Sequence, residues 1–382
     1  MDKDKNLFNI SSSNICLFSC CMQQANFKPF NNCSSTMKQI SKTLYLIPIY
    51  QDEMPKINYD IENVYEIVNK SYDSQFLTIL EYFKTQMKVL YHLSSIRHNI
   101  DICAFYLGDI SIFPILFAKI LRKKTVLLLG GCLEKEILLK NDSFGRLKLL
   151  FQKINLCLVD RLVLYSPRLI EEWNFNRYRD KIYIAHEHSL DFSKFTIRKQ
   201  FHEREKLVGY IGRFSEEKGV LNFIQACSIV LKKEGKHRFL LGGSGHLQHR
   251  IEELIHQKGL DNYVNLVGWI PHEMLPMYLN ELKLIVLPSF SEGLPNIMLE
   301  AMACGTPVLA APVGSIPDYV VDEQTGFIME NSTPECIAKN ILRVLSFGNI
   351  DRIVDNAKSL VESEFKSEVT VQKYKEVFNF DN

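Results

Sequence analysis

Short apolar runs alternate with segments of helical periodicity over most of the chain, and this alternation limits the fold more than any other feature. Within runs such as Leu44–Tyr50 and Leu284–Leu287, polar residues do not take every second position. Strands of this kind are buried on both faces, and connections with room for a helix join them as parallel neighbours. The pattern therefore predicts an α/β fold, in which parallel sheets are covered by helices on both sides.

The alternation occurs in two sets, which a polar segment at residues 191–205 separates. Ten runs, five in each set, are expected to be strands: 44–50, 101–107, 125–129, 161–165, 181–185, 207–211, 238–241, 264–267, 284–287 and 307–310. Two such sets joined by a linker predict two Rossmann-like, doubly wound domains that face each other across a ligand cleft. We expect a disordered tail at residues 1–37, an N-terminal domain at 38–196 and a C-terminal domain at 197–365.

Charge and hydropathy exclude several classes of protein. The 45 basic and 44 acidic residues give a net charge of +1, whereas nucleic-acid-binding proteins usually carry a large basic surplus. No apolar run reaches the roughly 18–20 residues that span a bilayer, and the first residues do not form a secretory signal. We therefore expect a cytoplasmic protein that has no nucleic-acid partner.

Four of the ten cysteines crowd the expected tail, at positions Cys16, Cys20, Cys21 and Cys33. Four thiolates can bind zinc, but this spacing is not a usual ligand pattern. Reduced thiols that bind no metal are therefore the favoured interpretation of these cysteines, and a zinc site is the alternative.

A glycine and two cations follow the expected strand 207–211, at Gly212, Arg213 and Lys218. Glycine lets the backbone turn tightly or approach a ligand closely. Arginine and lysine beside the start of a helix favour anionic groups, so this loop is a candidate for binding a diphosphate. The alternative is a charged surface loop with no ligand.

A second glycine-rich turn, which contains Gly243 and Gly245, follows the expected strand 238–241. A dinucleotide-binding motif needs a third glycine, and Gln248 stands at that position. We therefore expect Gly243 to form a tight turn close to a ligand, and NAD is only weakly indicated.

The segment 289–307 combines two carboxylates with backbone amides that can bind anions. Glu292 lies in the loop after strand 284–287, and Glu300 lies about two turns further on, in the helix that follows. The amides of Gly293 and Leu294 stand before that helix, whose N-terminus favours anions. Because carboxylates accept hydrogen bonds from hydroxyl groups, the segment suits a nucleotide sugar. The alternative is a pair of surface glutamates on an amphipathic helix.

Residues 207–330 resemble the donor-binding half of the family 4 retaining glycosyltransferases, which have the GT-B fold. The matching elements are Gly212 and Arg213 with Lys218, the turn at Gly243 and Gly245, the segment Val267–Ile270, the pair Glu292 and Glu300, and the segment Gly305–Val308. The resemblance implies that Arg213 and Lys218 hold the donor diphosphate. It also implies that Glu300 binds the ribose, that Glu292 binds the transferred sugar, and that the backbone at Gly268, Trp269 and Ile270 meets the base. A final helix within 366–382 would cross back to the N-terminal domain.

By this resemblance the protein is expected to transfer a sugar, with retention of configuration, from a UDP- or GDP-linked donor to a hydroxyl of a glycolipid or glycan. The expected catalytic residues are Arg213, Lys218 and Glu292. No Asp-x-Asp lies near either glycine-rich turn, so we expect no divalent metal and no other cofactor. The alternatives are a catalytically inactive subunit that binds sugar nucleotides, and another GT-B enzyme such as an epimerase or a phosphorylase.

The N-terminal half departs from the family pattern on the acceptor side. Residues 47–53 have no glycine where many members carry a glycine-rich loop, and residues 104–109 and 127–131 have no histidine at the strand ends. His186 and His188 stand where the hinge is expected. We interpret them as hinge residues that form hydrogen bonds, with cleft chemistry and metal binding as alternatives.

Residues 119–153 carry nine basic and three acidic residues in an otherwise neutral chain. Apolar residues recur there at helical spacing, at Phe144, Leu147, Leu150, Phe151 and Ile154. A basic amphipathic helix can lie in the headgroup region of an anionic membrane, so peripheral contact with a membrane surface is one expectation. The alternative is that this apolar stripe packs against the sheet.

Overall fold

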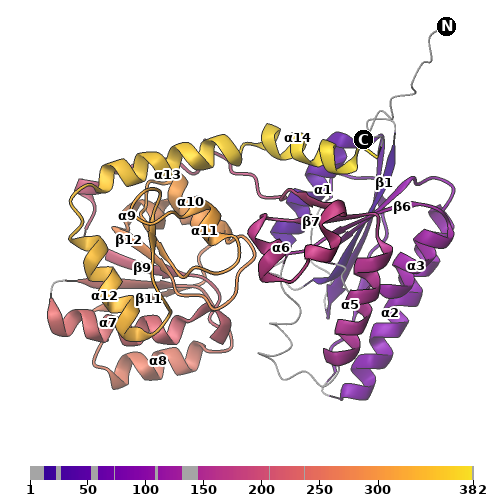
Figure 1. Ribbon diagram of the computed structural model, residues 1–382. Coiled ribbons are helices and arrows are strands. Elements are labelled where there is room, and N and C mark those ends of the chain that lie inside the picture. The colour runs from indigo at the N-terminus through magenta and orange to yellow at the C-terminus, as the bar shows by residue number, and fades with distance from the viewer. Residues whose placement is uncertain are drawn as a thin grey trace, which may run out of the picture. The chain divides into compact units, whose positions relative to one another are not determined.

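The computed structural model describes residues 13–22, 27–52, 59–72, 74–107, 111–130, 145–205, 207–235 and 237–380. It divides into two compact units (Figure 1): an N-terminal unit of residues 1–189 and 367–382, and a C-terminal unit of residues 190–366. The first boundary therefore falls at residue 189, where the sequence analysis placed it at residue 196. The last helix belongs to the N-terminal unit.

Within the described residues, the N-terminal unit is built on an eight-stranded sheet in which every pair of neighbours is parallel. The strand order is β3-β2-β1-β5-β6-β7-β8, and β4 also pairs with β2. The strands are β1 (Asn14–Met22), β2 (Thr43–Gln51), β3 (Asn63–Val64), β4 (Ile67–Asn69), β5 (Ile102–Tyr106), β6 (Lys124–Leu128), β7 (Arg161–Leu164) and β8 (Ile182–Ile184). The helices are α1 (Phe27–Ile40), α2 (Gln75–Ile96), α3 (Ile112–Ile120), α5 (Gly145–Leu158), α6 (Arg168–Glu172) and α14 (Ser367–Phe378).

Strand β1 and helix α1 occupy much of the segment that the sequence analysis took for a disordered tail. Strand β1 pairs with β2 on one side and with β5 on the other, so it lies inside the sheet. Ile15 and Leu17 are fully buried on it, and Phe30 and Met37 of α1 pack in the same core. A tail at residues 1–37 is therefore wrong for residues 13–22 and 27–37, whereas residues 1–12 and 23–26 lie outside the described part.

Among the described residues the first strand is therefore β1, and the expected first strand at residues 44–50 is the second, β2. A glycine-rich loop of the family type would follow β1, at residues 23–26, instead of residues 47–53. The sequence of that segment, Gln-Gln-Ala-Asn, also has no glycine. Neither segment therefore carries the glycine-rich loop that many members of the family have.

The two described cysteines of the zinc alternative lie on opposite faces of this sheet. Cys33 packs on the α1 face beside Ile15 and Leu17 of β1. Cys16 stands between these two residues, and successive side chains of a strand point to opposite faces. Both thiols are fully buried and cannot share a metal, so the zinc alternative fails for this pair. The side chains of Cys20 and Cys21 lie outside the described part.

Helix α14 packs against α1 and closes the N-terminal unit from the far end of the chain. Tyr374 and Phe378 of α14 are fully buried in the same core as Cys33 and Met37. The guanidinium of Arg161, the first residue of β7, donates a hydrogen bond to the carbonyl of Val377 at 2.7 Å. These buried contacts make α14 part of the core of the N-terminal unit.

The described part of the C-terminal unit contains a six-stranded parallel sheet in the order β11-β10-β9-β12-β13-β14. The strands are β9 (Leu207–Ile211), β10 (Arg238–Gly242), β11 (Val264–Gly268), β12 (Leu284–Leu287), β13 (Val308–Ala310) and β14 (Phe327–Ile328). The helices are α7 (Val220–Lys233), α8 (Gln248–Gln257), α9 (Leu275–Glu281), α10 (Asn296–Ala303), α11 (Ile316–Tyr319), α12 (Pro334–Leu345) and α13 (Ile350–Glu364).

All ten expected strands are present in the structure, each within one residue of its expected ends. The order of the second sheet reverses between β9 and β12. In doubly wound sheets, ligands bind beyond the carboxyl ends of the strands at such a reversal, because the two following loops diverge there. We therefore expect the loops that follow β9 and β12 to form the ligand site.

The expected linker at residues 191–205 is in fact packed onto the C-terminal unit. Arg204 is buried, and its guanidinium donates to the carbonyls of Cys304 at 2.7 Å and Leu282 at 3.0 Å. It also donates to the hydroxyl of Thr306 at 3.0 Å. The sequence looked like a linker because it is polar, whereas its arginine satisfies buried carbonyl groups of the domain.

Candidate active site

The loop after β9 and the loop after β12 meet at a glycine. Gly219 has a φ of +67°, and a Cβ atom there would lie 2.2 Å from the carbonyl oxygen of Pro288. Only glycine combines this backbone conformation with so close an approach. The amide of Phe290 donates to the carbonyl of Glu217 at 2.8 Å, which joins the two loops a second time.

Lys218 and Glu292 form an ion pair between these loops. The Nζ atom of Lys218 lies 2.7 Å from each of the two carboxylate oxygens of Glu292. The hydroxyl of Ser289 donates to the same carboxylate at 2.7 Å. The Glu292 side chain is 8% exposed and that of Lys218 is 22% exposed. The sequence analysis gave these residues to different parts of a donor, and the structure brings them into direct contact.

Arg213 lies in the same loop and its side chain is about half exposed. It forms an ion pair with Glu217 at 3.0 Å, and its carbonyl accepts a hydrogen bond from the hydroxyl of Tyr210 at 2.7 Å. Burial raises the pKa of Glu217, but hydrogen bonds and the charges of Arg213 and Lys218 bring that pKa below its ordinary value. Glu217 is therefore a carboxylate at neutral pH, and it holds the arginine beside the loop.

Glycine also allows the loops after β9, β10 and β11 to touch. A Cβ atom on Gly243 would lie 1.8 Å from the carbonyl oxygen of Gly212, so no other residue fits there without movement of the backbone. The amide of Gly243 donates to the carbonyl of Gly268 at 2.7 Å. The backbones of three predicted site residues therefore lie close together: Gly212, Gly243 and Gly268.

Glu300 lies on α10, is 2% exposed, and contacts a histidine that the sequence analysis did not identify. The Nε2 atom of His272 lies 2.9 Å from a carboxylate oxygen of Glu300. On the other side of the ring, the Nδ1 atom of His272 lies 3.3 Å from the Nζ atom of Lys194. His272 follows the predicted segment Gly268–Ile270 by two residues, and that proximity in sequence could have pointed to it.

The remaining predicted residues differ in exposure. Trp269 is 69% exposed, whereas the side chain of Ile270 is buried against the backbone of Gly242. Leu294 is buried as well, and the carbonyl of Gly293 accepts hydrogen bonds from the amide and hydroxyl of Ser315. Ile270 and Leu294 can therefore act only through their backbone, while Trp269 offers an exposed indole face.

The histidine pair of the N-terminal unit is buried beside α14. The Nδ1 atom of His186 lies 3.1 Å from the carbonyl oxygen of His188, and the hydroxyl of Thr370 donates to the same oxygen at 3.0 Å. These contacts agree with the hinge interpretation, in which the residues form hydrogen bonds. Within the described part of the chain, no group of three metal-ligating side chains is present, so the metal interpretation of the pair finds no third ligand.

Between the two histidines lies Glu187, a buried acid that the sequence analysis did not discuss. One of its carboxyl oxygens accepts hydrogen bonds from the hydroxyls of Tyr106 at 2.9 Å and Tyr165 at 2.8 Å. Burial raises the pKa of both phenols well above the ordinary value, so they remain donors at neutral pH. Tyr106 ends β5 and Tyr165 follows β7, so this cluster marks the carboxyl edge of the first sheet.

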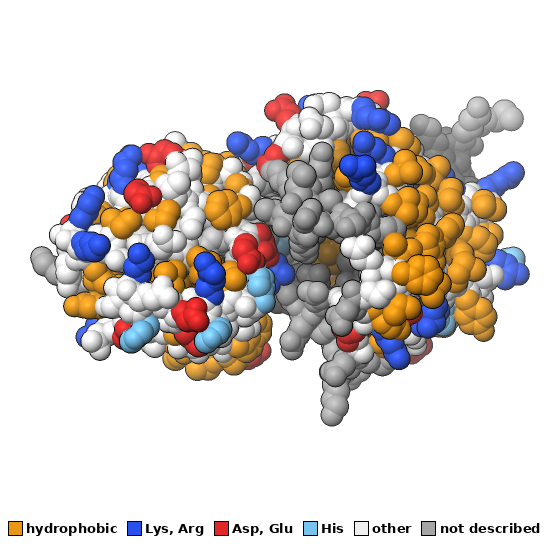
Figure 2. Space-filling view, turned by 90° about the horizontal axis from the view of Figure 1, so that it is seen from below, with side chains coloured by type: hydrophobic (Ala, Val, Ile, Leu, Met, Phe, Trp, Pro, Cys, Tyr) orange, Lys and Arg blue, Asp and Glu red, His pale blue; other side chains and the backbone are white. Residues whose placement is uncertain are grey.

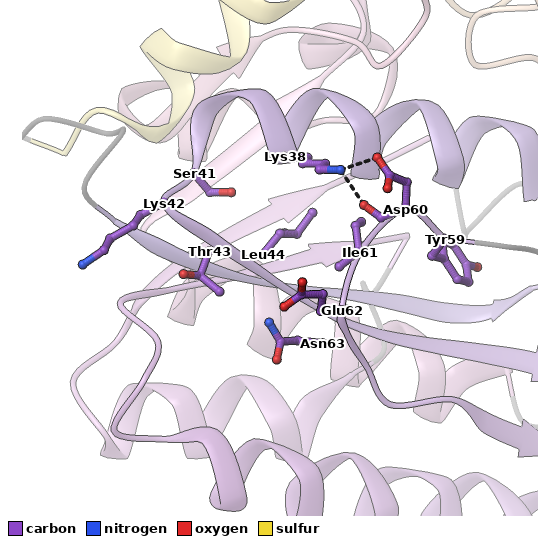
Figure 3. A pocket seen from close by; sticks show the side chains of 10 residues that line it. All are labelled: Lys38, Ser41, Lys42, Thr43, Leu44, Tyr59, Asp60, Ile61, Glu62 and Asn63. Carbon is purple, nitrogen blue, oxygen red and sulfur yellow. Dashed lines mark hydrogen bonds and ion pairs between the residues drawn. The ribbon is translucent and has the colours of Figure 1, made fainter.

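A cavity of about 460 Å³ lies on the N-terminal unit at the start of β2 (Figure 3). Lys38 and Asp60 form an ion pair at its margin, and Thr43 and Asn63 line it. Strand β2 begins at this place, so the cavity lies at the amino edge of a parallel sheet. Ligands of such sheets bind at the carboxyl edge, so we do not assign this cavity to the active site.

Comparison with known proteins agrees with this geometry. Residues 192–360 match the family model described as glycosyl transferases group 1. An uncharacterised glycosyltransferase of Methanocaldococcus jannaschii is 29% identical over 211 residues, which cover 54% of this chain and 52% of that protein. The amylovoran biosynthesis glycosyltransferase AmsK of Erwinia amylovora is 29% identical over 189 residues, 47% of this chain and 46% of its own length. The chain spans about half the length of the curated relatives it matches.

Solved structures resemble the chain over nearly its whole length. HepE of Anabaena in complex with UDP has a TM-score of 0.73 at 15% identity, and the match covers 95% of this chain and 98% of that one. Sucrose-phosphate synthase from Thermosynechococcus elongatus has a TM-score of 0.73 at 19% identity, over 96% of this chain and 98% of that chain. At such identities the likeness is one of fold.

The fold and the site define a protein with two Rossmann-like units of the GT-B type. Residues 192–360 carry a domain of the group 1 glycosyl transferases, and the resemblance to the family 4 enzymes is confirmed.

Proposed function

We propose that the protein is a retaining glycosyltransferase, which moves a sugar from a UDP- or GDP-linked donor to a hydroxyl of a glycolipid or a glycan. The contact between Lys218 and Glu292 at the reversal of the second sheet carries the proposal. A cation that can bind phosphate and a carboxylate that can accept hydrogen bonds from a sugar stand side by side there.

In this proposal Arg213 and Lys218 bind the diphosphate and stabilise its negative charge as the bond to the sugar breaks. Fixed cations can act on that charge because they are already in place when it develops. These two cations would replace a divalent metal ion, so we propose that the reaction needs no metal. The acceptor hydroxyl would attack from the face that the diphosphate leaves, which retains the configuration of the sugar, and its proton would pass to an oxygen of the leaving diphosphate.

Glu292 is proposed to bind the transferred sugar after Lys218 has turned to the diphosphate. The hydroxyl of Ser289 keeps the carboxylate of Glu292 in position during this exchange. Glu300 is proposed to accept hydrogen bonds from the ribose, with His272 fixing the direction of its carboxylate. The backbone of Gly268–Ile270 and the exposed ring of Trp269 are proposed to meet the base.

The class of acceptor rests on the relatives. The printed name of the Erwinia amylovora relative places it in amylovoran biosynthesis, and a Staphylococcus aureus relative is named for capsular polysaccharide biosynthesis. These names support a glycan or a glycolipid as the acceptor. A cytoplasmic location, where sugar nucleotides are expected, is part of the same proposal.

The test begins with the purified full chain and a panel of UDP- and GDP-linked sugars. A ligand that binds only the folded state raises the unfolding temperature, so thermal shifts identify the donor. Consumption of that donor is then followed with extracted lipid and glycan acceptors, and the anomeric configuration of the product is read by NMR. An α-linked product from an α-linked donor is expected.

Three outcomes would count against the proposal. A thermal shift with no consumption of donor favours the inactive binding subunit. An isomerised donor or a sugar phosphate as product favours the epimerase or the phosphorylase. An inverted product would overturn the retaining mechanism and leave the glycosyltransferase class intact.

A further inference from the structure

Helix α2 carries an apolar stripe that faces away from its own unit. Phe76, Leu80, Met87 and Tyr91 are 72%, 55%, 59% and 72% exposed, respectively. At 3.6 residues per turn, these four positions fall within roughly 60° of the helix circumference. The buried residues of α2, such as Val89 and Leu93, lie on the opposite side. Single exposed apolar residues are ordinary, but a continuous stripe of this kind marks a surface that contacts something.

Helices α3 and α5 extend this surface. Helix α3 packs against α2 and against α5, so the three helices lie side by side. Phe113 of α3 and Leu150 of α5 are 36% and 51% exposed. Figure 2 shows hydrophobic side chains gathered on one face of the N-terminal unit, with lysine and arginine side chains at the margins. We call the exposed side of α2, α3 and α5 the outer face.

The apolar stripe that the sequence analysis assigned to residues 144–154 has a different role. The described residues Leu147, Phe151 and Ile154 of α5 are half-buried. The ring of Phe151 stacks on that of Tyr82 of α2, with centroids 6.1 Å apart. These residues contact the neighbouring helix, whereas the packing alternative expected the sheet. Leu150 of the same stripe is 51% exposed, and Phe144 lies outside the described residues. The strongly exposed apolar side chains come instead from α2, which the sequence analysis had not associated with a membrane.

The charge of the outer face is almost entirely positive. Helices α2, α3 and α5 carry one acidic residue, Glu81, which is buried and forms an ion pair with a lysine of the same helix. They carry six basic residues: Lys84, Lys88, Lys119, Arg146, Lys148 and Lys153. Lys84 forms an ion pair with Glu81, and Lys119 forms one with Asp160, which follows α5. Because the whole chain has a net charge of only +1, this surplus is a local property of the face.

We propose that the outer face docks on an anionic lipid bilayer, with the α2 stripe inserted among the headgroups and the basic residues against the lipid phosphates. Aromatic and aliphatic side chains partition into this region, and lysine and arginine near it are attracted to anionic lipid. Within the described residues, no helix is long and apolar enough to cross a membrane, so the contact is peripheral. A second copy of the chain fits this face poorly, because a symmetric interface would oppose two surfaces of like charge.

The experiment measures co-sedimentation of the full chain with vesicles, without any donor, so its outcome does not depend on the transfer reaction. Vesicles of phosphatidylcholine alone are compared with vesicles of phosphatidylcholine and phosphatidylglycerol in equal parts. The protein is expected to sediment with the anionic vesicles at low salt and to be released by high salt. Equal recovery in the supernatant with both kinds of vesicle would overturn the proposal.

Two double variants distinguish the contribution of the apolar side chains to vesicle binding from that of the basic side chains. Phe76→Gln with Tyr91→Gln removes two inserted rings and should weaken partition by about tenfold or more. Arg146→Glu with Lys153→Glu should weaken it by about tenfold or more and reduce its dependence on salt. All four side chains are exposed, so the unfolding temperature should not change.

Matched controls lie on the C-terminal unit. Tyr263→Gln removes a ring that is 42% exposed there, and Lys232→Glu with Lys233→Glu reverses two exposed charges on α7. These changes should leave partition within about twofold of the wild-type value. A loss equal to that of the outer-face variants would contradict docking through this face. A wild-type dimer in solution that Phe76→Gln dissociates would show that a second copy covers the stripe, and would also overturn the proposal.

Discussion

The Nζ atom of Lys218 lies at hydrogen-bond distance from both carboxylate oxygens of Glu292, 2.7 Å in each case. The two residues are 74 positions apart in the chain and belong to loops on either side of the strand-order reversal. A diphosphate that binds Lys218 would share or compete for an ammonium group whose three N–H donors already serve both oxygens of Glu292. We propose that binding of the donor weakens the contact between Lys218 and Glu292, so that the two events are coupled.

The Lys218–Glu292 pair should show a measurable coupling in a double-mutant cycle. Lys218→Met leaves a mostly buried carboxylate without its cation, so we expect a loss of about 1–3 kcal/mol in the free energy of unfolding. Glu292→Leu added to Lys218→Met should cost less than the sum of the single changes, because the unpaired charge is gone. The measurement is chemical denaturation without donor. Effects that add within about 0.5 kcal/mol would show that the pair contributes no stability.

Removal of the Arg213 guanidinium should lower the turnover number. We expect Arg213→Ala to lower kcat by roughly 10²-fold or more, since it removes one charge that is proposed to stabilise the leaving diphosphate. The side chain is half exposed, so the unfolding temperature should hardly change. Arg250→Ala, on the surface of α8, is the matched control and should retain full activity. Near-normal turnover of Arg213→Ala would remove Arg213 from the proposed mechanism.

Glu300 and His272 should affect binding of the donor more than turnover. Glu300→Ala is expected to weaken binding of the nucleotide sugar without unfolding the chain. His272→Ala should raise the KM for the donor several-fold and leave kcat nearly unchanged, because His272 is proposed to orient Glu300 and not to touch the reacting groups. His272→Gln can still donate to that carboxylate and should restore most of the affinity. A fall in kcat at constant KM in His272→Ala would contradict the positioning role, and His256→Ala on α8 serves as the control.

The sequence predicts local features of this protein well. The ten expected strands are mostly apolar runs, and the glycines at positions 212 and 243 come directly after β9 and β10, where the chain leaves the sheet. Both features depend on neighbours in the chain. Strand β1 was missed because its serine and cysteines hid a buried strand within a polar segment, and only its pairing with β2 and β5 shows its place.

Contacts between distant segments lie beyond such patterns. Sequence spacing cannot show that Lys218 pairs with Glu292, or that Glu300 finds His272, because both contacts depend on how separate loops meet. The exposure of Phe76 and Tyr91 is a similar case. A helix whose apolar residues point to solvent has the same composition as one that is fully packed, and only the neighbouring helices distinguish the two.

The charge arrangement predicts activity without a divalent metal. Arg213 and Lys218 supply two cations next to the predicted diphosphate position, and they offer no ligand atoms to a metal ion. We expect the rate of transfer to survive EDTA at a concentration that removes magnesium and manganese. The measurement is donor consumption before and after dialysis against the chelator. A complete loss of activity that magnesium or manganese restores would show that these side chains do not replace the ion.

The buried His186 should make the folded protein less stable as the pH falls. Burial, and then the charges of His188 and Lys373, hold the pKa of His186 well below its ordinary value of 6.5, despite opposing hydrogen bonds to the backbone. Below pH 6.5 the unfolded chain therefore takes up a proton that the folded chain excludes. The free energy of unfolding should fall by up to about 1.4 kcal/mol per pH unit from this residue, and this contribution should be flat above pH 7.

The change in unfolding temperature between pH 8 and pH 5 measures this effect. In His186→Gln the decrease should be smaller than in the wild type, whatever the absolute stability of the variant, since glutamine does not titrate. His256→Gln alters an exposed histidine of α8 and should leave the decrease unchanged. If His186→Gln and the wild type lose stability equally over this range, the loss comes from other groups, and the buried ring of His186 is not what makes acid destabilise the fold.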